Sequence, residues 1–292
     1  MKFPPQLLLI LATVLWGGNF VIGRAVAGDI PPVTLSFLRW CVAFAVFLPF
    51  VYQRMRREWT MIRANWPAVI LMALTGVVGF AALVYIGLHY TTSINASLMN
   101  SSTPIIIYIL SFIFLKERLS RFQLLGTALS LVGVLFIISG GSLESLLAFS
   151  FNKGDLIVLV AVFCWGVYSL LVKQFAGHLP GHSTFLVTIA LGIITLLPFT
   201  IHELATSSTA IDWSPGIFGA ILYVGVAASI VAFLSWNSGV VAIGPNRASI
   251  YLNFIPLFAA VFAVLFLGEE VIIAQLIGGL AVVGGVMISN KK

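Results

Sequence analysis

Uncharged apolar runs of about 20 residues recur along this chain and constrain its fold more than any other feature. A helix needs roughly 20 apolar residues to cross the hydrocarbon core of a bilayer. Only 8% of the 292 residues are charged, whereas soluble domains carry roughly 25%. A surface this poor in polar groups suits lipid. Ten spans are predicted, within residues 3–23, 32–53, 64–88, 91–115, 122–143, 156–172, 183–201, 215–239, 248–268 and 271–290.

Basic residues separate to one side of this ten-span arrangement. Eleven of the fifteen lysines and arginines share the side that holds both termini, whereas Arg24 and Lys153 lie on the other side. Cytoplasmic loops of membrane proteins carry an excess of lysine and arginine, so both termini are predicted to be cytoplasmic. Nine or eleven spans would mix the two groups of charges, and the distribution therefore favours ten.

The second half of the chain repeats landmarks of the first. Residues that recur 152 positions later are Gly87, Ala96-Ser97, Pro104, Glu117, Gly126 and Gly133, as Gly239, Ala248-Ser249, Pro256, Glu269, Gly278 and Gly285, and Trp16-Gly17 recurs after 149 positions as Trp165-Gly166. Each half holds five predicted spans, an odd number, so the second half enters the membrane from the opposite side. The predicted fold is an all-α polytopic membrane protein of ten transmembrane helices. It consists of two inverted five-helix repeats, residues 1–143 and 154–290.

These landmarks resemble the EamA-type branch of the drug/metabolite transporter (DMT) superfamily. The residues that carry the likeness are Trp16-Gly17, Asn19-Phe20, Pro32, Arg39, the block from Ser93 through Pro104 to Arg118, and the block from Asn246 through Pro256 to Glu269. The sequence is similar in particular to bacterial YddG-type exporters of aromatic and other amino acids. The resemblance implies an inner-membrane exporter whose cavity is built from the first four helices of each half. The fifth and tenth helices are then packing elements or the contact of a homodimer.

Acidic residues are confined to span ends and loops, and this distribution restricts the substrate. A carboxylate at the middle of a span is costly and usually functional, and none is predicted there. A pump for organic cations would need such an anion, and carriers of phosphorylated solutes would need a basic cluster. Only Arg39 and Arg247 could contribute to one. The cavity therefore suits a neutral, zwitterionic or mildly hydrophobic solute.

Aromatic and amide side chains lie at depth in the predicted spans instead. Aromatic faces with a few polar groups suit the side chain and polar ends of an amino acid. The alternatives are that a deep tryptophan only packs, that asparagine bonds a neighbouring helix, and that Arg39 extends to the outer interface instead of contacting a carboxylate or forming a gate. The predicted substrate-binding residues are Trp16, Asn19, Arg39, Tyr85, Asn100, Trp165, Tyr168, Trp236, Tyr251 and Asn253.

Prolines and glycines mark further mechanical features. Pro104 and Pro256 fall within matched spans, where they are either hinges or plain packing kinks. Gly126 and Gly133, like Gly278 and Gly285, are seven residues apart and give each helix one smooth face for close contact, within a monomer or between monomers.

The predicted function is a secondary transporter that exports amino acids or related small metabolites by alternating access. Its partners are the small-molecule substrate and the lipid bilayer, without nucleic acid. No metal site, cofactor or enzymatic motif is predicted, and the two cysteines form neither a disulfide framework nor a zinc pattern. Alternatives are a carrier of sugar, nucleotide-type or drug-like metabolites in the same superfamily, a channel, and a membrane-embedded enzyme.

Overall fold

The computed structural model describes residues 3–91, 96, 99–147, 152–207, 211, 213–267 and 273–291. Throughout these residues the regular structure is helical, without strands. Within this described part of the chain, six segments are long and apolar enough to cross a membrane. They are α1 (Pro5–Ala25), α2 (Pro32–Ala64), α3–η1–α4 (Trp66–Met72, Ala73–Phe80, Ala81–Tyr90), α9 (Lys153–Gln174), α10 (Gly181–Thr206) and α11–η3–α12 (Pro215–Leu222, Tyr223–Val231, Ala232–Ile243).

Shorter helices complete the described part of the chain. They are α6–η2 (Thr103–Leu110, Ser111–Leu115), α7 (Arg121–Ile138), α8 (Leu143–Leu147), α13 (Pro245–Ser249), η4 (Ile250–Asn253), α14 (Phe254–Leu267) and α15 (Ile273–Ser289). Large apolar side chains such as Phe112, Ile194 and Leu280 are 61%, 67% and 74% exposed. Lipid can cover such a surface and water cannot. The prediction of an all-helical polytopic membrane protein is therefore confirmed.

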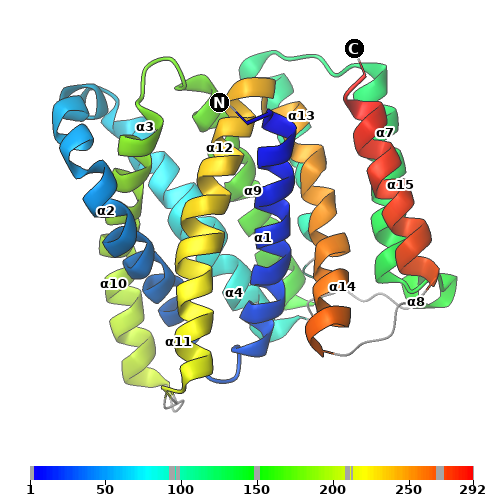
Figure 1. Ribbon diagram of the computed structural model, residues 1–292, viewed down its shortest axis with the longest axis horizontal. Coiled ribbons are helices and arrows are strands. Elements are labelled where there is room, and N and C mark those ends of the chain that lie inside the picture. The colour runs from blue at the N-terminus through cyan, green and yellow to red at the C-terminus, as the bar shows by residue number, and fades with distance from the viewer. Residues whose placement is uncertain are drawn as a thin grey trace.

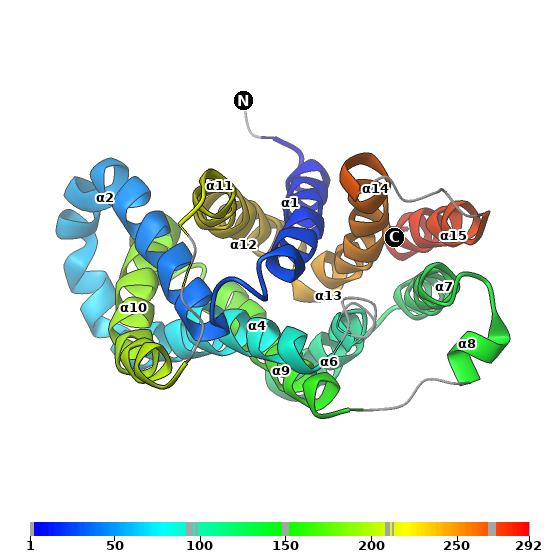
Figure 2. The same cartoon turned by 90° about the horizontal axis from the view of Figure 1, so that it is seen from below.

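Helix contacts of the first half have counterparts in the second (Figures 1 and 2). α1 packs against α12 and α14, and α9 packs against α4 and α6. α2 packs against η3, and α10 packs against η1. α2 and α10 form a pair at one edge of the molecule, and α7 and α15 form a pair at the opposite edge. In Figure 1, α1 runs downward and α9 upward, and both termini lie at the upper end.

Matched glycines show the same correspondence at the level of single residues. A Cβ atom at Gly17 would lie 2.8 Å from Cβ of Phe258, and one at Gly166 would lie 3.2 Å from Cγ2 of Ile106. Phe258 follows Ile106 by the same 152 residues that relate the other landmarks. The close approach of α1 to α14 is thus repeated by that of α9 to α6.

α7 and α15 contact each other through the glycines that the sequence singled out. A Cβ atom at Gly133 would lie 2.6 Å from the carbonyl oxygen of Gly278, and one at Gly278 would lie 2.5 Å from that of Gly133. Gly126 and Gly285 face each other in the same reciprocal way. These smooth faces are therefore used within one monomer, and a homodimer through α7 and α15 would have to use their other faces.

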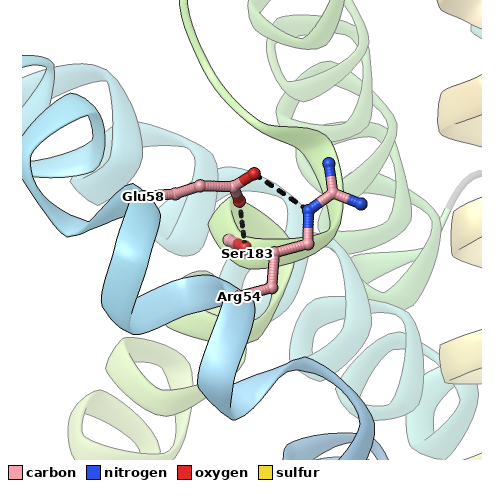
Figure 3. A network of polar contacts seen from close by, with 3 residues as sticks. All are labelled: Arg54, Glu58 and Ser183. Carbon is pink, nitrogen blue, oxygen red and sulfur yellow. Dashed lines mark hydrogen bonds and ion pairs between the residues drawn. The ribbon is translucent and has the colours of Figure 1, made fainter.

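A carboxylate reaches across to each end of the α2–α10 pair. Near the C-terminal end of α2, Glu58 accepts hydrogen bonds from Arg54 and from the hydroxyl group of Ser183 in the first turn of α10 (Figure 3). At the other end, Glu203 of α10 accepts bonds from the backbone N–H groups of Val33 and Thr34, at 3.1 and 2.7 Å. The first N–H groups of a helix lack partners within it, so Glu203 stabilises the start of α2.

The two candidate hinge prolines begin helices instead of interrupting them. Pro104 is the second residue of α6, and Pro256 is the third residue of α14, directly after the 3-10 turn η4. In the first turn of a helix, proline costs no intrahelical hydrogen bond.

Candidate substrate-binding site

A cluster of aromatic rings occupies the centre of the molecule, where α1, α9 and α12 meet. The ring centroids of Trp16 and Trp165 are 5.1 Å apart, and those of Trp165 and Trp236 are 5.5 Å apart. Phe233 lies 5.1 Å from Trp165, and Tyr168 lies 5.3 Å from it. All five side chains are buried. The structure thus brings four of the predicted site residues into one cluster.

A small cavity of about 20 Å³ lies beside this cluster. A cavity of this size holds about one water molecule and no organic solute. Six predicted site residues line it, namely Trp16, Asn19, Arg39, Tyr85, Asn100 and Trp165, together with Phe20, Phe80, Ala81, Val84, Phe233, Leu252 and Ile255.

Arg39 is the cation of this cavity, and its side chain is only 4% exposed. Its guanidinium donates to Ser229 Oγ at 2.7 Å, to Tyr85 Oη at 3.0 Å and to the Ala228 carbonyl oxygen at 3.4 Å. It also lies over the rings of Trp40 and Tyr85, with its central carbon 5.0 and 5.7 Å from their centroids. Such contacts with ring faces are favourable for a cation. Arg39 is therefore directed into the bundle, and it does not extend to an interface.

The π-helical segment η3 supplies two of these Arg39 partners. Ser229 and Ala228 both lie in η3, and the Ala228 carbonyl oxygen also accepts a bond from Trp16 Nε1 at 3.0 Å. Short π-helical segments occur often at functional sites. Here the segment links α1 and α2 to the second half of the chain.

Two polar side chains of the cavity lining are hydrogen-bonded to each other, and two others contain buried donors without a partner among the described residues. Tyr85 Oη donates to Asn19 Oδ1 at 2.9 Å, which leaves both groups paired. By contrast, Asn100 Nδ2 and Trp165 Nε1 are buried and have no hydrogen-bond partner in the described structure. Buried donors are usually paired, so two unpaired donors in one small cavity need an explanation.

A larger recess of about 790 Å³ opens beside the aromatic cluster, among α1, α9, α10 and α12. It is lined by the start of α1 and the end of α9, on the side of the molecule where both termini lie. Tyr168 and Asn237 line it and are hydrogen-bonded to each other at 2.8 Å. Trp165 and Phe233 line the small cavity, whereas Tyr168 and Phe185 line the recess. Tyr168 contacts Trp165, and Phe185 stacks on Phe233 with ring centroids 5.5 Å apart, so these rings lie between the two linings.

A third hollow, of about 450 Å³, lies between the end of α1 and the start of α11. Its lining includes Asp29 and Ser214, and it shares no lining residue with the central cavity.

Three predicted site residues line neither the small cavity nor the larger recess, which Tyr168 lines. Trp236 belongs to the aromatic cluster and donates to Ser169 Oγ at 3.2 Å. Tyr251 accepts a bond from Asn290, the residue directly after α15, at 3.0 Å, and Asn253 donates to Ser130 of α7 at 2.9 Å. Tyr251 and Asn253 therefore tie η4 to α15 and α7, as expected of polar residues that join helices.

Several lining residues were not among the predicted ones. Phe20, Phe80, Phe233, Leu252 and Ile255 face the cavity, but in a chain that is 60% hydrophobic no single apolar residue is distinctive. Glu117, one of the repeated landmarks, accepts a bond from Asn246 Nδ2 at 2.9 Å. Glu269 and the motif residues Ser93, Ile94, Asn95 and Ser97 lie outside the described residues.

Comparisons with known proteins agree with this architecture. The sequence model of the EamA-like transporter family matches residues 4–139 and 152–291. The uncharacterized transporter YyaM of Bacillus subtilis (strain 168) is 29% identical, with 97% of this chain and 92% of the relative covered. A probable terminal-alkyne amino-acid exporter of Streptantibioticus cattleyicolor is 26% identical, with 97% and 92% covered.

A solved crystal structure with the same fold matches with a TM-score of 0.80. It is 19% identical, and the match covers 99% of this chain and 97% of that one. The relatives are described as transporters, which indicates transport and not catalysis.

Proposed function

Because the chain belongs to the EamA-like transporter family, and is thus a multi-pass membrane transporter, we propose that it exports amino acids or related small metabolites by alternating access. The named bacterial relatives support a placement in a bacterial inner membrane. Amino acids as cargo are supported by the relative named as an amino-acid exporter and by the resemblance to YddG-type exporters. No carboxylate is found among the described residues of the cavity lining, which also favours a neutral or zwitterionic solute over an organic cation.

The chain consists of two inverted five-helix repeats, residues 1–143 and 154–290. Three observations support this part of the proposal: the family model matches twice, the helix contacts of the halves correspond, and α1 and α9 run in opposite directions. Inverted repeats allow each half to adopt the conformation of the other. Exchanging the two conformations moves an opening from one face of the membrane to the other.

The observation that carries the proposed mechanism is the central cavity between the halves. Trp16, Arg39 and Tyr85 of the first half meet Trp165 and Phe233 of the second around it. At about 20 Å³ it is closed to solutes, while the larger recess opens toward the termini. With cytoplasmic termini, the recess faces the compartment from which an exporter takes its substrate. Withdrawal of the aromatic rings between the two spaces would admit the solute.

Pro104 and Pro256 act as hinges in this scheme. Each lies in the first turn of a helix, and both α6 and α14 contact the helices that carry the central tryptophans. A change of direction at these points would move α6 and α14 without breaking an intrahelical hydrogen bond.

Counterflow in proteoliposomes that contain only this protein tests the proposal. The screen covers amino acids, nucleosides, sugar phosphates and organic cations, with and without a proton gradient. We expect saturable flux of an amino acid that unlabelled substrate on the opposite side accelerates. Trp165→Ala and Tyr85→Ala should reduce it, whereas Trp213→Ala, on an exposed side chain, should not.

Three results would contradict parts of this proposal. Normal flux in both cavity variants would reject the site. Flux that neither saturates nor shows counterflow would indicate a channel. Transport confined to sugar phosphates or nucleosides would favour the other metabolite carriers of the superfamily.

A further inference from the structure

Two buried polar atoms of the central cavity have no hydrogen-bond partner among the described residues, and both are N–H donors. Asn100 Nδ2 and Trp165 Nε1 have no hydrogen-bond partner among the described residues, and their side chains are 2% and 0% exposed. Arg39 adds a buried positive charge to the same lining. The Arg54–Glu58 contact is the sole ion pair within the described residues, so no described carboxylate neutralises Arg39. A buried charge without a counter-charge is costly, and a bound anion would relieve that cost.

The internal repeat shows that the fold itself does not demand these donors. Trp16, the counterpart of Trp165, has the equivalent indole N–H paired with the Ala228 carbonyl oxygen. Asn100 corresponds to Leu252, 152 residues later, and Leu252 lines the same cavity. Arg39 corresponds to Thr188, 149 residues later, whose hydroxyl group only bonds to its own helix. Arg39, the amide of Asn100 and the unpaired N–H group of Trp165 therefore have no equivalent at the matching positions of the other half. All three residues line the central cavity.

We infer that the cavity recognises a free carboxylate of the transported solute, with Arg39, Asn100 and Trp165 as its donors. This inference rests on the proposed function, because it takes the central cavity as the substrate site. The planar guanidinium group of arginine matches the geometry of a carboxylate and can donate two parallel hydrogen bonds to it. An amide N–H and an indole N–H add neutral donors of the kind that fix the orientation of a ligand.

Arg39 can turn to a ligand at small cost to its present contacts. Its Nη2 lies 3.4 Å from the Ala228 carbonyl oxygen, at the long end of hydrogen-bond distances, and this oxygen already accepts from Trp16. The bonds to Ser229 and Tyr85 use Nε and Nη1 and can hold the side chain in place meanwhile.

The remainder of the cavity lining suits the apolar part of an organic acid. Phe80, Phe233, Leu252 and Ile255, which have hydrocarbon side chains, line the cavity. Inorganic anions would leave this apolar surface without a partner, so an organic carboxylate is favoured over phosphate.

Ligand binding to the purified protein tests the inference without any transport. Binding is followed by isothermal calorimetry and by the intrinsic fluorescence of the central tryptophans. The probes are alanine, phenylalanine, butyrate and 3-phenylpropionate, each compared with its primary amide, and inorganic phosphate. We expect at least one acid to bind at least about tenfold more tightly than its amide, as loss of a charged hydrogen bond implies.

Arg39→Met should weaken binding of that acid about 10- to 100-fold and leave the weak binding of the amide unchanged. Arg247→Met is the matched control, because it removes the same charge from an exposed side chain and should leave binding unchanged. The inference is wrong if no acid in the panel binds more tightly than its amide, if phosphate binds more tightly than every acid, or if Arg39→Met binds the acid normally.

Asn100→Leu provides a second variant that does not depend on the structural role of Arg39. It introduces the residue of the matching position, Leu252, and removes a donor that has no described partner. We expect a fold at least as stable as the wild type, with acid binding several-fold weaker. A merely structural role of Asn100 predicts the opposite pair of results, and normal acid binding in this variant would also contradict the inference.

The two proposals fail in distinguishable ways. Acid binding that depends on Arg39 in a protein without counterflow would refute the transporter mechanism and leave the carboxylate site intact. Saturable counterflow of amides or amines that is unaffected by Arg39→Met would refute the carboxylate site and leave the transporter mechanism intact.

Discussion

Replacing either central tryptophan by phenylalanine should have opposite hydrogen-bonding consequences. Trp16 and Trp165 are both buried, at 5% and 0% exposure, and occupy matching positions of the two halves. Trp16→Phe removes the 3.0 Å bond to the Ala228 carbonyl oxygen, whereas Trp165→Phe removes an N–H group that has no partner in the described structure. Both substitutions delete the same ring atoms, so the cost of the vacated space is similar and the difference reports the N–H group.

The magnitude follows from the usual cost of made and unmade hydrogen bonds. A buried hydrogen bond contributes about 0.5–1.5 kcal/mol to stability, and a buried unpaired donor costs about 1–3 kcal/mol. The Trp165→Phe protein should therefore be more stable than the Trp16→Phe protein by about 1.5–4.5 kcal/mol in free energy of unfolding.

Equilibrium unfolding in detergent micelles measures this difference. Far-ultraviolet circular dichroism is the appropriate signal, because the substitutions change the tryptophan fluorescence itself. Since the two rings are in contact, the effects of the two substitutions on the free energy of unfolding are not expected to add in a double variant. The comparison therefore uses the two single variants. Equal stability of the two single variants, or lower stability of Trp165→Phe, would refute the view that Trp165 keeps an unpaired donor for a ligand.

Three further predictions concern other parts of the molecule. Gly133→Leu should destabilise the protein by about 1–3 kcal/mol because its Cβ would meet Gly278 of α15. Gly219→Leu, with open space around it, should not, and thermal denaturation in detergent compares the two. Glu203→Gln should lower the melting temperature, because the charged acceptor at the start of α2 is lost. Glu144→Gln, on an exposed side chain, should leave it unchanged. Tags on the two termini should be accessible from the same compartment, and opposite accessibility would exclude two inverted five-helix halves.

The sequence by itself determined the features that depend on one segment at a time, such as the length and hydropathy that a helix needs to cross the bilayer. Length and hydropathy identify membrane-crossing segments, because each segment must satisfy the bilayer on its own. Recurrence of Pro104 as Pro256 and of Trp16 as Trp165 predicted related halves, because this signal needs only the order of residues. Membership in a transporter family was likewise readable from motifs along the chain.

The direction of the Arg39 side chain could not be predicted from the sequence. Its position left open whether the side chain extends to an interface or contributes to a site. Only the approach of η3, about 190 residues away in the sequence, directs it into the bundle through Ser229. Gly133 similarly predicted a close helix contact, but only the fold assigned that contact to Gly278 of the same chain.

The cavity itself was decided by the tertiary structure. Asn100 and Asn253 are both amides in apolar spans, yet Asn100 lines the cavity and Asn253 bonds to Ser130 of α7. Phe233 lines it as well, although nothing in the sequence distinguishes it from other phenylalanines. The physical reason is that hydropathy acts on each helix separately, whereas the lining of a cavity depends on how distant helices turn toward one another when they pack.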